Sequence, residues 1–193
     1  MKKSTASVRK NAILKAAAAL LAALLLVPAL ASCSNDDWYP AGMQLASDKD
    51  ADYKLWVPSG WTVDLSTGVA TAYVSDRDRT SVSLVAFNLR ENPDVTAAEY
   101  WEENLPLLTS TFPDLQIEVN GDQLNIADVI GSKYVYTATV TNVSYRYTQI
   151  LMVRAGYVYI LTFTEAVEST EDHSEFFANI IEDFSFRDQK IEK

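Results

Sequence analysis

Alternating apolar and polar residues predict that strands dominate the C-terminal half of this chain. The alternation runs through 133–141, 144–154 and 157–164. One predicted face holds Tyr134, Tyr136, Ala138 and Val140, and another holds Tyr157, Tyr159, Leu161 and Phe163. The links at Asn142 and at Ala155–Gly156 are too short for any connection except a hairpin. The three segments are therefore expected to form an antiparallel meander.

Shorter segments with strand character lie earlier in the chain. They are predicted at 53–57, 69–74, 81–89, 115–119 and 123–126. The first stops at the turn residues Pro58–Ser59–Gly60, and the polar run 75–79 is expected to be a hairpin loop. Asn120–Gly121 is predicted to be a type I′ turn, because both residues tolerate a positive φ.

Two segments have helical periodicity. The first begins with a capping-box pattern at Thr96 and Glu99, and Pro106 is expected to kink it. Its apolar stripe consists of Ala97, Trp101, Leu105, Leu108 and Phe112. The second is expected to begin near Ser169 or Thr170, with a core face of Phe176, Phe177, Ile180, Ile181 and Phe184. The fold class is therefore α+β: two main helices packed on an antiparallel sheet of about six strands, as an α/β/α sandwich.

The N-terminus has the order of a secretory signal peptide. Five basic residues come first, an Ala/Leu-rich run follows from 16 to 31, and Ser32 precedes Cys33. The stretch from Ala16 to Ser32 has 17 residues, contains Pro28 and is short for a membrane span, which needs roughly 20 apolar residues. Cys33 is the only cysteine, and its position resembles the bacterial lipobox. That resemblance implies diacylglyceryl attachment to Cys33, cleavage between Ser32 and Cys33, and a protein anchored to the extracytoplasmic face of the cell membrane.

These features divide the chain into a signal peptide at 1–32, a tether at 33–50 and one domain at 51–193. Without the leader, 11 basic and 26 acidic residues remain, a formal net charge of −15. Such a charge repels phosphate backbones, so no nucleic-acid partner is expected. With Cys33 acylated, the domain has no thiol for a disulfide and depends on its core.

Few residues suggest chemistry. His173 is the only histidine and borders the apolar face of the last predicted helix, so we interpret it as a core-edge or capping residue. No Gly-x-Ser-x-Gly motif accompanies it, and no catalytic residue is predicted. Zinc sites need several His or Cys ligands. The acidic run 48–52 opens like an EF-hand loop, but Tyr53 and Ser59 occupy the positions that require Gly and Glu. No metal and no cofactor are therefore expected, and the acidic run is interpreted as a solvated tether.

The surface candidates are aromatic and acidic. Trp56 and Trp101 have core periodicity, Trp61 follows a turn and is expected at a rim, and Trp38 is expected at the surface or membrane interface. Asp76 and Asp78 alternate with two arginines and are expected to pair with them locally. The candidate ligand or partner surface consists of Trp61, Asp76, Asp78 and His173.

Four segments taken in order resemble the PsbP/Mog1 group of domains. They are the strand and turn 53–61, the strand 81–85, the strand 154–164, and the final helix and short strand 176–186. The resemblance implies an α/β/α sandwich around an antiparallel sheet. It also implies a non-enzymatic role, because known members include a photosystem accessory protein and a nuclear-transport cofactor. No functional residue is carried over from it.

Together these inferences predict a lipid-anchored, non-enzymatic binding or accessory module that contacts another envelope protein. The partner would dock on an exposed sheet face or on the acidic surface. The alternative is a receptor for a small ligand or cation, with a pocket between sheet and helix.

Overall fold

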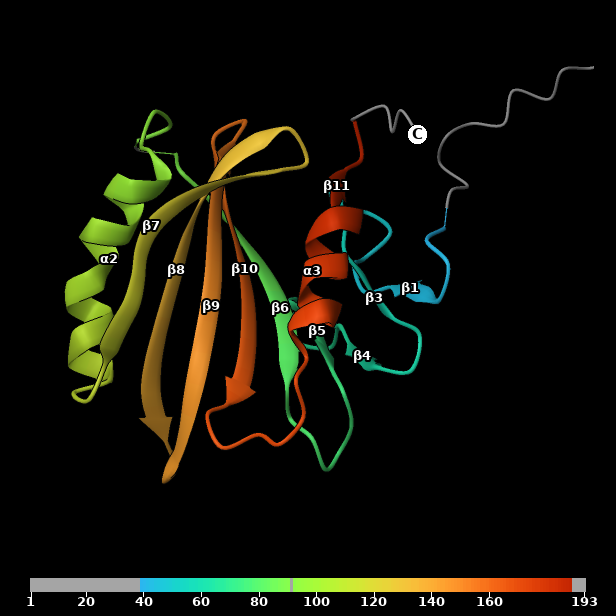
Figure 1. Ribbon diagram of the computed structural model, residues 1–193. Coiled ribbons are helices and arrows are strands. Elements are labelled where there is room, and N and C mark those ends of the chain that lie inside the picture. Colours follow the sequence, from blue (N-terminus) through green and yellow to red (C-terminus); the bar gives the residue numbers. More distant parts are fainter. Residues whose placement is uncertain (1–38, 91, 189–193) are drawn as a thin grey trace, which may run out of the picture. The chain divides into compact units, whose positions relative to one another are not determined.

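The computed structural model describes residues 39–90 and 92–188, and its largest element is a seven-stranded antiparallel sheet (Figure 1). The strands lie in the order β4-β5-β6-β10-β9-β8-β7. Their bounds are β4 Thr62–Asp64, β5 Ala70–Tyr73, β6 Ser81–Asn88, β7 Gln116–Ile126, β8 Val129–Val140, β9 Val143–Arg154 and β10 Tyr157–Ala166. The predicted meander is confirmed as β8, β9 and β10, each paired antiparallel with the next.

The turns of the meander use left-handed backbone. Thr141 and Asn142 join β8 to β9 with φ values of 50° and 66°, and Ala155 and Gly156 join β9 to β10 with 51° and 76°. Positive φ at both central residues defines the type I′ turn, whose twist matches that of paired strands. Ala127 and Asp128 do the same between β7 and β8, with φ values of 48° and 56°.

The turn predicted at Asn120–Gly121 is wrong. Both residues lie inside β7, which continues from Gln116 to Ile126 and pairs with β8. The register shifts between Ile117 and Val119 and again between Asn120 and Asp122. Gly121 has a φ of 90° at the second shift. A positive φ suits a bulge as well as a turn, so the dipeptide bends an edge strand here and does not reverse it.

The predicted strand 53–57 does not join the main sheet. β2 (Tyr53–Lys54) pairs with β11 (Ser185–Phe186), and β3 (Trp56–Pro58) pairs with β1 (Met43–Leu45). Residues 53–57 are all buried, so the segment is covered on both sides and does not alternate between core and solvent. The stretch expected to be a tether contributes β1 and the fully buried Ala46 to the domain core.

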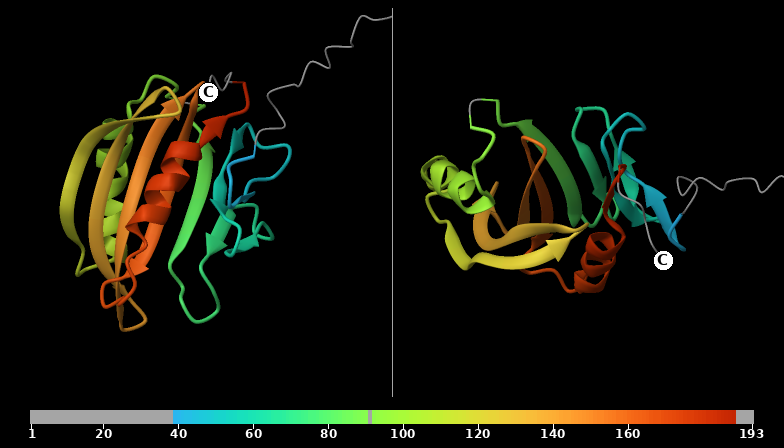
Figure 2. Two further views of the ribbon diagram at one scale, coloured as in Figure 1. Left: turned by 45° about the vertical axis from the view of Figure 1, so that its right-hand side comes forward. Right: turned by 90° about the horizontal axis from the view of Figure 1, so that it is seen from above.

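The two helices lie on opposite sides of the sheet (Figure 2). α2 (Ala97–Thr111) packs on β8 and β9, and Trp101 stacks on Tyr134 with a centroid distance of 4.0 Å. α3 (Ser174–Asp183) packs on the other face, where Phe177 stacks on Phe163 at 4.7 Å. Successive strand residues face opposite sides of a sheet, so neighbouring residues of β9 belong to the two separate cores. Two main helices on an antiparallel sheet confirm the predicted fold class.

α3 begins later than predicted. Its first residue is Ser174 and its N-cap position is His173, not Ser169 or Thr170. The His173 side chain makes no capping hydrogen bond. Instead, the Asp172 carboxylate accepts a hydrogen bond from the Ser174 N–H at 2.9 Å, which holds the chain in a turn just before the helix. Phe176, predicted in the core face, is 42% exposed.

The capping box predicted for α2 is confirmed and supports a first prediction. Thr96 Oγ1 accepts the Glu99 N–H at 3.2 Å, and the Glu99 carboxylate accepts the Thr96 N–H at 2.8 Å. We expect Thr96→Ala to lower the free energy of unfolding by about 1 kcal/mol, because one N–H of the first turn loses its acceptor. Urea denaturation followed by circular dichroism measures this loss.

Thr109→Ala is the control for the capping prediction. Thr109 lies on the same helix, and its hydroxyl only donates a hydrogen bond to the Leu105 carbonyl. Removal of this hydroxyl should therefore leave the free energy of unfolding almost unchanged. The hydrogen bonds from Thr96 lower the pKa of Glu99. The contribution of Glu99 is therefore complete at neutral pH and lost as the pH falls through that lowered pKa. Equal stabilities of the two variants at neutral pH would contradict the assignment of the cap.

Candidate functional site

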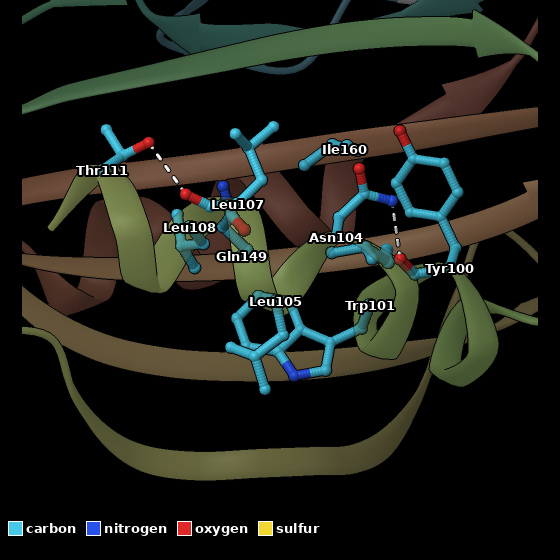
Figure 3. A pocket seen from close by; sticks show the side chains of 10 residues that line it. Tyr100, Trp101, Asn104, Leu105, Leu107, Leu108, Thr111, Gln149 and Ile160 are labelled. Atoms are coloured by element: carbon cyan, nitrogen blue, oxygen red, sulfur yellow. Dashed lines mark hydrogen bonds between the residues drawn. The ribbon is translucent and has the colours of Figure 1, made fainter.

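A groove runs between α2 and the sheet (Figure 3). It encloses a cavity of about 250 Å³ that is open to solvent. Its apolar walls are formed by Tyr100, Leu107 and Leu108 of α2, Leu151 of β9 and Ile160 of β10. We call this feature the α2 groove.

Three polar side chains of the α2 groove each donate a hydrogen bond within the protein. Asn104 donates to the carbonyl of Tyr100 at 2.8 Å, and Thr111 donates to the carbonyl of Leu107 at 2.8 Å. The amide of Gln149 donates to the hydroxyl of Thr162 at 3.2 Å. Most of the lining residues are apolar, so the groove offers mainly apolar surface to an incoming group.

Apolar surface continues from the α2 groove across the neighbouring strand. Ile160 pairs with Val85 of β6, and the fully buried Val158 pairs with Phe87, so Val85 and Phe87 lie on the face that bears α2. Phe87 is 48% exposed and Leu107 is 68% exposed. α2 packs on β8 and β9, and within 39–90 and 92–188 no helix lies over β6 on this face. The groove is thus one side of a broader, partly uncovered sheet face.

A second group of side chains lies around His173. Asp78, in the loop between β5 and β6, places Oδ2 3.2 Å from His173 Nε2. Glu171 places Oε2 3.6 Å from the same nitrogen. The other oxygen of Asp78 accepts the Thr80 N–H at 2.9 Å, which orients this carboxylate. His173 is buried, Asp78 is partly buried and Glu171 is exposed. We call Asp78, Glu171 and His173 the His173 cluster.

The structure brings together three of the four predicted surface residues. Trp61 packs edge-on against Phe176 with a centroid distance of 6.2 Å, and Phe176 also lies 6.0 Å from the His173 ring. Trp61 is only 7% exposed, so its predicted position at a rim is wrong: Phe176 covers it. Asp78 faces His173 and does not pair with a neighbouring arginine as expected.

The fourth predicted residue, Asp76, remains apart from this group. It is exposed and lies 3.9 Å from Arg79, the local pairing that the sequence suggested. Glu171 was missed, because one glutamate in an acidic stretch gives no signal of its own. Ser32, Cys33 and Trp38 lie outside the described residues.

Other sequence expectations have clear outcomes. Trp56 and Trp101 are buried, as their periodicity predicted. The acidic run 48–52 is not a free tether, because Asp52 accepts a hydrogen bond from the Tyr159 hydroxyl and Arg187 donates to backbone carbonyls of the run. Burial and this contact with Asp52 raise the pKa of Tyr159. The run therefore holds the N-terminal part of the domain against β10.

Comparisons with solved structures identify the architecture. The cyanobacterial PsbP protein (CyanoP) of Synechocystis sp. PCC 6803 matches 81% of this chain and 98% of its own, with a TM-score of 0.55 and 14% identity. Two lower matches are PA94 of Pseudomonas aeruginosa (TM-score 0.49, 17% identity, 73% and 94% of the two chains) and LpqN of Mycobacterium tuberculosis (0.46, 13%, 74% and 88%). LpqN is involved in cell envelope biogenesis.

No protein-family model matches this chain, and no curated protein sequence matches it. At 14% identity the likeness to CyanoP shows the fold alone. The domain therefore has a PsbP-like fold, as the sequence resemblance implied. Within the described part of the chain, no helix has both the length and the apolar character to cross a membrane.

Proposed function

We propose that this protein is a non-enzymatic binding module, held by a lipid on Cys33 at the extracytoplasmic face of a bacterial membrane. Its α2 groove receives an apolar segment of another envelope protein. The observation that supports this function is the groove itself, with its apolar walls and the exposed side chain of Leu107, next to the uncovered strand face that bears the exposed Phe87. A groove of this kind suits an apolar anchor of a partner.

The size of the cavity favours a protein partner over a small-molecule ligand. Pockets for drug-sized ligands measure about 300–1,000 Å³, and this cavity measures about 250 Å³. It has room for one or two side chains, while the uncovered face along β6 provides further contact area. The alternative function, a receptor for a small ligand, would use the same cavity. The experiment below distinguishes it from a protein-binding module.

The negative charge of α2 favours a partner segment that carries basic residues. α2 carries Glu99, Glu102 and Glu103 in its first half and no basic residue anywhere along its length. The chain without its leader is strongly acidic as a whole. Complementary charge speeds association and orients a complex. The expected partner segment therefore carries apolar anchors flanked by Lys or Arg.

A crosslinking experiment tests the proposed function. A photo-crosslinking amino acid at Leu107 in living cells should capture one envelope protein, and the same group at Ile130 should not. Ile130 is the matched control because it is 70% exposed, close to the 68% of Leu107, and lies outside the groove. With the captured protein purified, we expect Leu107→Glu to weaken binding to the full chain at least tenfold and Ile130→Glu to leave it unchanged.

Two results would contradict a protein partner. One is equal capture at positions 107 and 130. The other is binding that Leu107→Glu does not weaken. A crosslinked adduct with the mass of a small molecule would instead support the receptor alternative. Because Leu107 is mostly exposed, Leu107→Glu should change folding stability little.

A further inference from the structure

The His173 cluster joins residues that are remote in the sequence. Asp78 comes from the β5–β6 loop, while Glu171 and His173 come from the segment that leads into α3. One ligand atom from each residue lies within 4.8 Å of the other two. We propose that these three side chains bind a divalent transition-metal ion, with zinc as the best fit.

The separations between the ligand atoms suit such an ion. Zinc binds nitrogen and oxygen ligands at about 2.0–2.1 Å in tetrahedral geometry, which places neighbouring ligand atoms about 3.3 Å apart. The Nε2 atom of His173 lies 3.2 Å from Asp78 Oδ2 and 3.6 Å from Glu171 Oε2. The two carboxylate oxygens lie within 4.8 Å of each other. Glu171 would move closer to the other two ligands, and its side chain is 73% exposed.

The donor set and its support also favour a metal. One imidazole and two carboxylates suit zinc and similar transition metals better than calcium, which prefers oxygen ligands alone. The Thr80 N–H holds one oxygen of Asp78 and leaves the other to face His173. The imidazole is itself fixed, since its side chain is 3% exposed and its ring lies against Phe176.

The competing interpretation is a hydrogen bond without a metal. An imidazole that carries its hydrogen on Nε2 can donate it to Asp78 across the same 3.2 Å contact. A single N–H is directed at one of the two carboxylates, whereas a metal ion would bind both. Among the described residues Nδ1 has no hydrogen-bond partner, so the polar contacts of the ring are those at Nε2. Arg79, on the same loop as Asp78, is engaged by Asp76 and lies over the Tyr73 ring.

A bound zinc ion would crosslink the β5–β6 loop to the start of α3. With three protein ligands, the fourth tetrahedral position would be left for water. The sequence predicts no metal, because zinc sites need several His or Cys ligands and this chain has one histidine. The fold adds two carboxylates, one of them from a loop remote in the sequence. The cluster shares no residue with the α2 groove. Failure of the metal proposal would therefore leave the proposed function untouched, and the reverse also holds.

The single histidine of the chain makes the test direct. The full chain is purified in detergent without a histidine tag, and zinc is titrated while the imidazole signals are followed by ¹H–¹⁵N spectroscopy. We expect one zinc per chain, a change at the Nε2 signal and a rise in Tm. Binding at any other group, including Cys33, would leave the imidazole signals unchanged.

Three variants separate a metal site from a hydrogen-bonded cluster without a metal. Glu171→Gln and Asp78→Asn should each weaken zinc binding at least tenfold in calorimetry, because each removes one ligand charge. Glu182→Gln is the matched control: Glu182 is an exposed glutamate of α3 that lies outside the cluster and outside the cavity beside it, so its loss should leave the affinity unchanged. If Asp78→Asn fails to fold, Glu171→Gln is still a sufficient test, because Glu171 is exposed. Unchanged imidazole signals, or equal affinities of Glu171→Gln and Glu182→Gln, would overturn the proposal.

Discussion

Replacing Trp101 with alanine is expected to lower the free energy of unfolding by about 3–5 kcal/mol, the usual cost of removing a buried tryptophan. Trp101 is 5% exposed and stacks on Tyr134 at 4.0 Å and against Tyr136 at 5.9 Å. The core beneath α2 is small, and Trp101 is its only buried large side chain from the helix. Without it, α2 loses its main hold on β8 and β9. Urea denaturation followed by circular dichroism measures the loss.

Hydrogen exchange shows whether the loss is local to the helix. Amides of α2 should exchange faster in Trp101→Ala, while those of β9 and β10 change less, because the α3-side core keeps its contacts. Leu107→Ala is the matched control on the same helix and should stay within about 0.5 kcal/mol of the wild type, since Leu107 is exposed. A loss below about 1 kcal/mol with unchanged α2 protection would contradict the anchoring role of Trp101.

The helix that contains Trp101, α2, also shows what the sequence could predict. Thr96, Glu99 and the apolar stripe gave the position of α2, because a capping box and 3.6-residue periodicity are local signals. The sequence also predicted the β8–β9–β10 meander, because the three segments alternate between apolar and polar residues and their links are too short for any connection except a hairpin. Asn120–Gly121 was misread for a physical reason: a positive φ is common to turns and bulges, and only pairing with β8 decides between them.

The candidate sites depend on information that is not local. Trp61 was placed at a rim because it follows a turn, yet Phe176, more than a hundred residues later, packs against it. Asp78 was predicted to pair with neighbouring arginines, but the fold places His173 beside it. The α2 groove exists because α2 packs on β8 and β9 and leaves the face of β6 without a helix, and no sequence period specifies that offset. Side-chain type and periodicity therefore predicted burial better than they predicted partners.

Replacing Cys33 with serine is expected to abolish lipid attachment entirely, the largest effect that we predict. The wild-type chain recovered from membranes should have a mass that lacks residues 1–32 and includes a diacylglyceryl group on Cys33. A hydroxyl is a far weaker nucleophile than a thiolate, so Cys33→Ser should carry no lipid and keep its leader. Intact-mass spectrometry of both proteins makes the comparison, and Ser34→Ala, one residue further on, should match the wild type.

The mass of the wild-type protein also decides how the domain is held at the membrane. One acyl chain gives only weak, reversible membrane binding, whereas two or more anchor a protein stably. A diacylglyceryl group would therefore keep the domain at the membrane without help from its acidic surface, which anionic headgroups repel. The α2 groove would then be free to meet a neighbouring envelope protein. If the wild-type mass includes the leader, or if the sulfur of Cys33 carries no lipid, both the anchor and the proposed location are wrong.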